Sequence, residues 1–321
     1  MPSRFDDRLR VSENLSGRSP RRLPVLVAVL LVGFLTCLQA ASPHPSAQAT
    51  PVEDAVTITA AARALQPGEL VVLTIRTKTA EEAVHVRAFG HDVPPFRIDP
   101  HEWQALAGID LDVAPGSYTV TADAGPASRK LHATHELIVR AKKFSTRTLT
   151  VNDAFVNPPP SVTDRIASEA KELEQIWKST STERLWTEPF LRPVPENANS
   201  AFGSRSVFNG QPRSPHGGAD FLSPAGTPVK APNAGRVLIA RDLYFTGNTV
   251  VIDHGLGLFS MLAHLSAIDV QAGDLVKAGV VVGRVGATGR VTGPHLHWAV
   301  RVEGARVDPL SLLAVIGVPK S

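Results

Sequence analysis

The sequence predicts a mainly β protein with two folded domains. Its 321 residues exceed the roughly 100 to 200 residues of one typical domain. Residues 55–157 contain seven short β-type runs between Pro and Gly turns, and residues 200–321 hold 17 of the 24 glycines among runs of Val and Ile. Such patterns are typical of antiparallel sheets. We therefore expect an N-terminal β-sandwich, a connector and a C-terminal antiparallel sheet.

The first 42 residues have the composition of an export signal. Residues 1–24 contain six Arg and three acidic side chains, and the 14 residues 25–38 carry no charge. Fourteen helical residues span about 21 Å, less than the roughly 30 Å hydrocarbon core of a membrane. We expect residues 1–42 to be a signal peptide, or alternatively a membrane anchor through residues 25–41. Either would place the rest of the chain outside the cytoplasm, in the periplasm or cell envelope.

The formal charge of +3 gives no reason to expect a nucleic-acid partner. Residues 25–321 contain 27 basic and 27 acidic side chains, so the excess belongs to the first 24 residues. The one cysteine, Cys37, lies in the apolar segment. Any metal site in the mature chain must therefore be built from His and carboxylate ligands.

The first folded region follows a Pro-rich linker at residues 43–54 and extends over residues 55–157. Its β-type runs are 56–59, 70–75, 84–89, 109–113, 118–121, 137–139 and 148–151. Seven short strands in about 100 residues predict an immunoglobulin-like sandwich. Five histidines here have no metal-ligand spacing, and we expect them to be solvated or on strand faces: His85, His91, His101, His132 and His135.

Residues 158–199 are predicted to form a helical connector. Three prolines at 158–160 end the sandwich, and Thr163 can cap a helix. Apolar residues then recur at helical spacing: Ile166, Ala170, Leu173 and Trp177. Such a stripe predicts packing of the helix against a neighbouring domain.

Three histidine-containing elements in the C-terminal region are candidates for chemistry. His216 and Asp220 are four residues apart with Gly217-Gly218 between them, which favours a bent extended segment. His295 and His297 would share one face of a strand. His264 lies in a strand-like run. His254 is interpreted as a turn residue.

Together these elements offer four imidazoles and one carboxylate, which is enough for a catalytic zinc with three N/O ligands and an open position. Two imidazoles would remain for proton transfer. Each element alone is weak evidence, because a lone His is more often structural than catalytic. The spacing does not decide which of His295 and His297 would bind the metal.

The region 202–310 resembles the lysostaphin-type zinc endopeptidases of bacterial cell walls, the M23 or LytM-domain family. The matching motifs appear in the family's order: Phe202-Gly203-Ser-Arg205, His216-x-Gly218-x-Asp220, Gly247-Asn-Thr-Val-Val-Ile-Asp253-His254-Gly255, Ala263-His264-Leu-Ser266, Gly283-Arg-Val-Gly286-Ala-Thr-Gly289-Arg-Val-Thr-Gly293-Pro-His295-Leu-His297 and Val307-Asp308-Pro309. The resemblance implies a peptidase domain over residues 200–316, folded as an antiparallel β-sheet groove.

The resemblance also implies the residue roles. His216, Asp220 and His297 would bind Zn²⁺, and His264 and His295 would be the free catalytic imidazoles. Arg205 and Asn209 would lie near a substrate carboxylate, or be structural.

The implied activity is a zinc metalloendopeptidase that hydrolyses amide bonds in peptidoglycan stems or cross-links. The alternatives are a catalytically silent module that regulates other wall hydrolases and a secreted protease acting on proteins. A regulatory envelope protein is an expected partner.

Overall fold

The computed structural model describes residues 55–126, 128, 130–150, 156–199 and 202–317. They belong to one compact unit, Glu53–Ser321, whereas the separate unit Met1–Val52 lies outside the described residues. The predicted signal or anchor therefore also lies outside them. No helix in the described ranges is long and apolar enough to cross a membrane.

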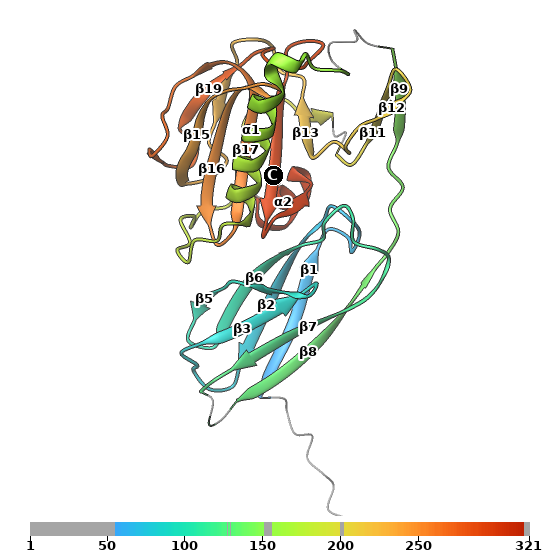
Figure 1. Ribbon diagram of the computed structural model, residues 1–321. Coiled ribbons are helices and arrows are strands. Elements are labelled where there is room, and N and C mark those ends of the chain that lie inside the picture. The colour runs from blue at the N-terminus through green and yellow to red at the C-terminus, as the bar shows by residue number, and fades with distance from the viewer. Residues whose placement is uncertain (1–54, 127, 129, 151–155, 200–201, 318–321) are drawn as a thin grey trace, which may run out of the picture. The chain divides into compact units, whose positions relative to one another are not determined.

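Two four-stranded antiparallel sheets form the N-terminal β-sandwich (Figure 1). Their strand orders are β1-β2-β6-β5 and β4-β3-β7-β8. The bounds are β1 Val56–Ala62, β2 Leu70–Thr77, β3 Val84–Ala88, β4 His91–Val93, β5 Pro95–Asp99, β6 Glu102–Gly108, β7 Gly116–Ala124 and β8 Leu131–Val139. In β3 alternate residues are buried and exposed, as expected where one face of a sheet covers a core. The immunoglobulin-like character of the sandwich stays a prediction.

The prediction of a strand at residues 109–113 is wrong. The strand is β6, one segment earlier, and Asp110 Oδ1 accepts the N–H of Asp112 at 3.0 Å in the turn that follows it. β6 shows no clear alternation because both of its faces are covered. Ala105 and Ala107 lie in the sandwich core, while Leu106 lies in the core of the C-terminal sheet.

The last strand predicted for the sandwich and the helix of the connector both belong to the C-terminal half. β9 Thr146–Leu149 pairs in parallel with β11 Arg205–Phe208, which pairs with β12 Gln211–Pro212. The 3-10 helix η3 Pro160–Val162 precedes α1 Thr163–Lys178. The N-cap residue is Val162, so the prediction that Thr163 caps the helix is wrong, since Thr163 is already helical.

Helix α1 packs across the C-terminal sheet, as its apolar stripe predicts. The rings of Trp177 and Phe259 lie 5.6 Å apart between centroids. At the other end of the helix, Arg165 forms a salt bridge of 2.7 Å with Asp242.

Within the described residues, the C-terminal sheet has ten strands in the order β10-β13-β20-β17-β16-β15-β18, with β14, β19 and β21 attached to this path. The bounds are β10 Ala198–Asn199, β13 Gly218–Phe221, β14 Pro228–Lys230, β15 Gly235–Leu243, β16 Gly247–Gly255, β17 Leu258–Ile268, β18 Leu275–Val276, β19 Val281–Val285, β20 Leu296–Val302 and β21 Ala305–Val307. The chain continues into helix α2 Pro309–Ile316. The prediction of a mainly β protein with antiparallel sheets is confirmed.

One hydrophobic cluster joins the C-terminal sheet to the outer face of the sandwich. It contains Leu70 and Leu106 of the sandwich together with Trp298 of β20 and Leu312 of α2. The backbone N–H of Leu70 also donates to Ser311 Oγ at 2.9 Å. The two halves therefore share a core.

Candidate metal centre and active site

Strand β20 separates a core face from a polar face. Leu296, Trp298, Val300 and Val302 are fully buried in the core. Because side chains alternate along a strand, His297, Ala299 and Arg301 point to the opposite face. The sequence predicted that His295 and His297 share one face of this strand and that Leu296 lies on the other. The burial of Leu296 agrees with this prediction.

Strand β13 brings Asp220 beside His297. The two residues are partners in the antiparallel register of β13 and β20. A Cβ on Gly218 would lie 2.5 Å from the Trp298 carbonyl oxygen and 2.7 Å from His297 Cε1. The close approach of the two strands therefore requires glycine at residue 218.

Backbone hydrogen bonds hold His216 at the start of this strand. Its N–H donates to the Ser204 carbonyl at 2.9 Å, and its carbonyl accepts the N–H of Gly203 at 2.7 Å. Gly203 has φ of 73°, a left-handed conformation that favours glycine. A Cβ there would also collide with the ring of Phe144.

The three predicted metal ligands converge on one point. His216 Nε2 lies 3.0 Å from His297 Nδ1 and 3.1 Å from Asp220 Oδ1, and His297 Nδ1 lies 3.0 Å from Asp220 Oδ1. If both imidazole nitrogens donate a proton to Asp220, neither can accept one from the other. The three contacts therefore cannot all be hydrogen bonds at the same time. Among the described residues, this is the group of His, Cys, Asp and Glu ligand atoms close enough to hold a metal ion.

The spacing of these atoms fits a small divalent metal. N and O ligands bind Zn²⁺ at about 2.0–2.1 Å, and tetrahedral geometry then separates ligand atoms by about 3.3 Å. The observed 3.0–3.1 Å needs only a small expansion. Two imidazoles and one carboxylate are a donor set typical of catalytic zinc sites.

The carboxylate of this cluster is held ionised. Burial opposes ionisation of Asp220, but hydrogen bonds from His216 and His297 outweigh it and hold the pKa of Asp220 well below its usual range. Burial lowers the pKa of His297, although its hydrogen bond to Asp220 opposes that shift. An ionised carboxylate beside a neutral imidazole has the protonation states that metal ligands require.

A β-bulge turns His264 toward the same face. Leu262 and Leu265 are both fully buried, although residues three apart point to opposite faces in a regular strand. The register of β16 and β17 shifts between them, and His264 has φ of 64°. A positive φ is unusual for a non-glycine residue and is frequent at functional sites.

Backbone carbonyls fix the tautomers of both remaining imidazoles. His264 Nδ1 lies 3.0 Å from the Thr288 carbonyl oxygen, and His295 Nδ1 lies 2.9 Å from that of Gly293. Since a carbonyl only accepts, each Nδ1 must carry the proton, which leaves each Nε2 free to accept one.

The two rings lie together beside the ligand cluster. The ring centroids of His264 and His295 are 4.9 Å apart, and those of His264 and His297 are 5.9 Å apart. Burial lowers the pKa of His264 to about 3, and the proximity of His297 contributes to this shift. The His264 imidazole is therefore neutral at pH 7, and its Nε2 can accept a hydrogen bond from water.

His254 is not a turn residue, and that interpretation was wrong. It lies in β16 and is fully buried. Its Nδ1–H donates to the Ala234 carbonyl at 2.7 Å, and its Nε2 accepts from Ser260 Oγ at 2.9 Å. Ser260 Oγ in turn accepts the Trp298 Nε1–H at 3.1 Å. Both ring nitrogens are occupied, so His254 has a structural role beneath β20.

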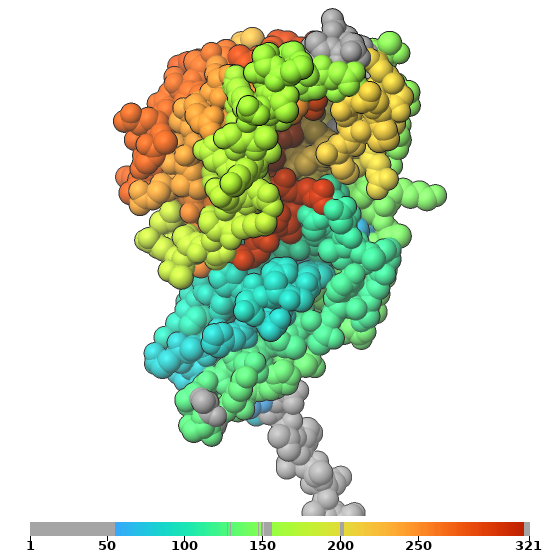
Figure 2. All heavy atoms as spheres, viewed as in Figure 1, coloured from blue at the N-terminus to red at the C-terminus, as the bar shows by residue number. Residues whose placement is uncertain are grey.

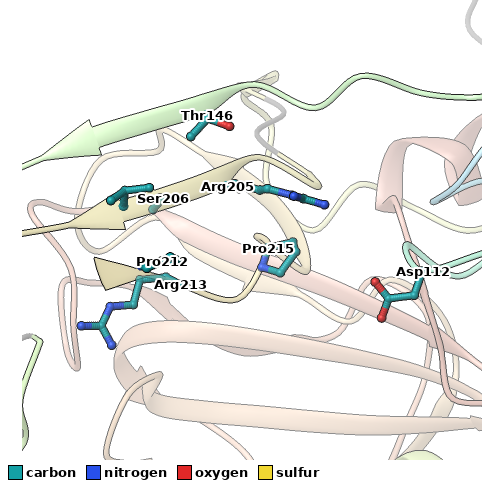
Figure 3. A pocket seen from close by; sticks show the side chains of 8 residues that line it. Asp112, Thr146, Arg205, Ser206, Pro212, Arg213 and Pro215 are labelled. Atoms are coloured by element: carbon teal, nitrogen blue, oxygen red, sulfur yellow. The ribbon is translucent and has the colours of Figure 1, made fainter. Parts of the chain in front are cut away.

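A separate open cavity of about 450 Å³ is lined in part by Pro215, the residue before His216 (Figure 3). It is lined by Asp112, Thr146, Arg205, Ser206, Val207, Pro212, Arg213 and Pro215. The Arg205 side chain extends toward Asp112 and Pro215. None of the five predicted site residues lines this cavity.

Comparisons with known proteins show the family to which the chain belongs. The family model of peptidase family M23 matches residues 214–309. A crystal structure from Pseudomonas aeruginosa assigned to peptidase M23 is 33% identical and superposes with a TM-score of 0.61, covering 78% of this chain and 95% of that chain. The chain belongs to peptidase family M23.

Two curated relatives match the C-terminal region. Peptidoglycan DD-endopeptidase ShyA from Vibrio cholerae is 45% identical over 96 residues, which are 30% of this chain and 22% of ShyA. DD-carboxypeptidase/endopeptidase Mpg from Neisseria meningitidis serogroup B is 43% identical over 97 residues, 30% of this chain and 22% of Mpg. The match thus spans about a fifth of the length of these relatives.

Proposed function

We propose that this chain is a zinc metalloendopeptidase that hydrolyses amide bonds in the peptide stems or cross-links of peptidoglycan. The observation that carries the proposal is the convergence of His216 Nε2, Asp220 Oδ1 and His297 Nδ1 within 3.1 Å of one another. The names of the matched relatives, ShyA and Mpg, support the substrate class.

In this proposal His216, Asp220 and His297 bind Zn²⁺. A bound zinc ion would polarise the scissile carbonyl and lower the pKa of water toward 7. The N₂O set of ligands leaves one position open. The negative charge of Asp220 compensates part of the charge of the ion.

The two free imidazoles carry the protons. The Nε2 of His264 or His295 accepts a proton from the attacking water, and an imidazolium returns it to the leaving amine nitrogen. To stabilise the negative charge that develops on the carbonyl oxygen, the second imidazole, 4.9 Å away between ring centroids, must carry a proton on Nε2 as well as on Nδ1. Water adds to the amide, which yields a carboxylate and an amine.

We further propose the division of the chain and its location. Residues 1–42 would be a signal peptide or anchor, residues 43–54 a linker, residues 55–157 an immunoglobulin-like domain, residues 158–199 the connector and residues 200–316 the peptidase domain. The basic and apolar segments at residues 1–38 support export to the periplasm or cell envelope.

Digestion of purified sacculi tests the proposed activity. The full chain should bind one zinc per molecule and release muropeptides with new amine and carboxyl termini, which mass spectrometry identifies. A silent regulatory module would release none, and a general protease would cleave a protein substrate in preference to sacculi.

A further inference from the structure

Arg301 lies on the same face of β20 as the proposed zinc ligand His297. The two residues are four positions apart, which corresponds to about 13 Å along a strand, and Ala299 lies between them. A Cβ placed on Gly217, the neighbour of His216, would lie 4.0 Å from Arg301 Nη2. Arg301 is therefore placed at one end of the proposed active site.

Aromatic side chains surround the guanidinium on its other side. Arg301 Cζ lies 5.7 Å from the centroid of the Trp177 ring, and Phe259 is the cross-strand partner of Arg301. Trp177 also contacts Phe259. Helix α1 thus closes this end of the polar face. Figure 2 shows a hollow between α1 and the segment of β11 and β12, coloured yellow.

Among the described residues, no carboxylate forms a salt bridge with the Arg301 guanidinium, although the charge of Asp110 acts on it from farther away. Arg301 Nε is buried and has no hydrogen-bond partner among the described residues. Its neighbour across the strands, Arg306, instead forms salt bridges with both Asp110 and Asp112. The nearby carboxylates are therefore committed to Arg306.

Such an arrangement is unfavourable for the protein alone. Burial, together with the charge of Arg306, lowers the pKa of Arg301 to about 10, although the charge of Asp110 opposes this shift. A buried cation without an opposite charge is destabilising, and an anion that enters beside it gains a strong charge-assisted contact. The planar guanidinium is suited to bidentate binding of a carboxylate.

We propose that Arg301 binds a free carboxylate of the peptide substrate, on the order of 10 Å from the scissile amide given the strand spacing. This inference rests on the proposed peptidase function and adds a determinant of substrate choice. Gly217, which lacks a side chain, leaves room for the carboxylate to approach. The C-terminal carboxylate of a peptide stem has the chemistry that the site recognises.

A set of three substrates tests whether Arg301 binds the terminal carboxylate, with the full zinc-loaded chain as the enzyme. Three cross-linked peptides are compared: one with all carboxylates free, one amidated at the C-terminus and one amidated at a side-chain carboxylate. Wild type should cleave the C-terminally amidated peptide with about 10–100-fold lower kcat/KM, the effect expected for losing a charge-assisted hydrogen bond. Preference against the side-chain amide instead would overturn the terminal-carboxylate assignment.

Substitutions then connect the preference to Arg301. Arg301→Gln should raise KM for the free-carboxylate peptide about 10–100-fold, change kcat less and abolish the discrimination between peptides. Arg301→Lys keeps the positive charge and should retain part of the discrimination between peptides. Arg284→Gln removes an exposed arginine of β19 and should leave the discrimination intact.

Failures of the two proposals are distinguishable. If wild type cleaves no stem peptide, the proposed function fails. If it cleaves all three peptides equally, only the role of Arg301 is overturned. If Arg301→Gln binds less zinc or unfolds earlier, the Arg301→Lys variant decides: a folded, zinc-loaded Lys variant with unchanged KM and unchanged discrimination contradicts the proposal.

Discussion

The role of each histidine follows from the contacts that its two ring nitrogens make. In His264 and His295 one nitrogen is bonded to a carbonyl and the other is free. In His254 both nitrogens are bonded. His216 and His297 direct a nitrogen at Asp220. Sequence spacing contains none of this information, which is why His254 was misinterpreted.

Replacing His264 with Ala separates metal binding from proton transfer. His264→Ala should keep stoichiometric zinc but lose about 10²–10⁴-fold in kcat, because a positioned acid or base contributes that much. Metal analysis and muropeptide release from the same sample measure both effects.

The matched control for this variant is His132→Ala, which removes an exposed sandwich histidine and should change neither quantity. Loss of zinc from His264→Ala would show that the assignment of ligand and catalytic roles is wrong.

The lowered pKa of His254 predicts that the protein loses stability on acidification. Burial lowers its pKa from 6.5 to about 4, so between these values the unfolded chain binds more protons than the folded one. Stability from this residue is therefore complete above pH 6.5 and falls as the pH is lowered toward 4, by up to about 3 kcal/mol.

Urea unfolding of wild type and His254→Asn at pH 7 and pH 4.5 tests this linkage. The variant should be less stable at pH 7 but should lose less stability between the two pH values. An equal loss in both proteins would contradict the assigned role of His254.

At the scale of elements, the site depends on the close pairing of β13 with β20. Gly218→Ala should displace His297, because the added Cβ would lie 2.8 Å from His297 Nε2 and 2.5 Å from the Trp298 carbonyl oxygen. We expect zinc affinity to fall by at least about tenfold, the scale on which disturbing ligand orientation acts. A competition titration with a chelator measures it.

Gly116→Ala is the control for this substitution, since its Cβ would meet only Tyr118 at 3.9 Å. It should leave zinc affinity unchanged. A Gly218→Ala protein with wild-type zinc affinity would mean that His297 is not held by this contact.

Strands dominated by β-branched and apolar residues were the ones that the sequence could predict. The runs at residues 70–75 and 249–252 lie within β2 and β16, because β-branched and apolar residues dominate them. β6 was missed, since it contains no β-branched residue and its polar and apolar residues do not alternate. The bulge at His264 is also set by neighbouring strands and leaves no local signal.

For the whole molecule, the shared core implies that the two halves unfold together. Leu70 of the sandwich is fully buried in the cluster of the C-terminal sheet. Leu70→Ala should therefore destabilise the protein by about 2–5 kcal/mol and shift one common transition in calorimetry. Zinc-dependent activity should be lost in the same temperature range.

Ile138→Ala, at a residue that is 60% exposed, is the control and should have little effect. Two separate transitions, with only the sandwich transition shifted by Leu70→Ala, would contradict the shared core. The shared core could not be predicted from sequence composition. Leu70 and Leu106, which join the two halves, are ordinary strand residues that composition assigns to the sandwich alone.

We propose that one metal ion held by His216, Asp220 and His297 makes this chain a peptidoglycan hydrolase. The most direct measurement is muropeptide release from purified sacculi by the full chain, before and after removal of its metal. We expect release to stop when a chelator removes one zinc per chain and to return when zinc is restored. Release that survives complete metal removal, or a chain that binds no stoichiometric metal, would contradict the claim.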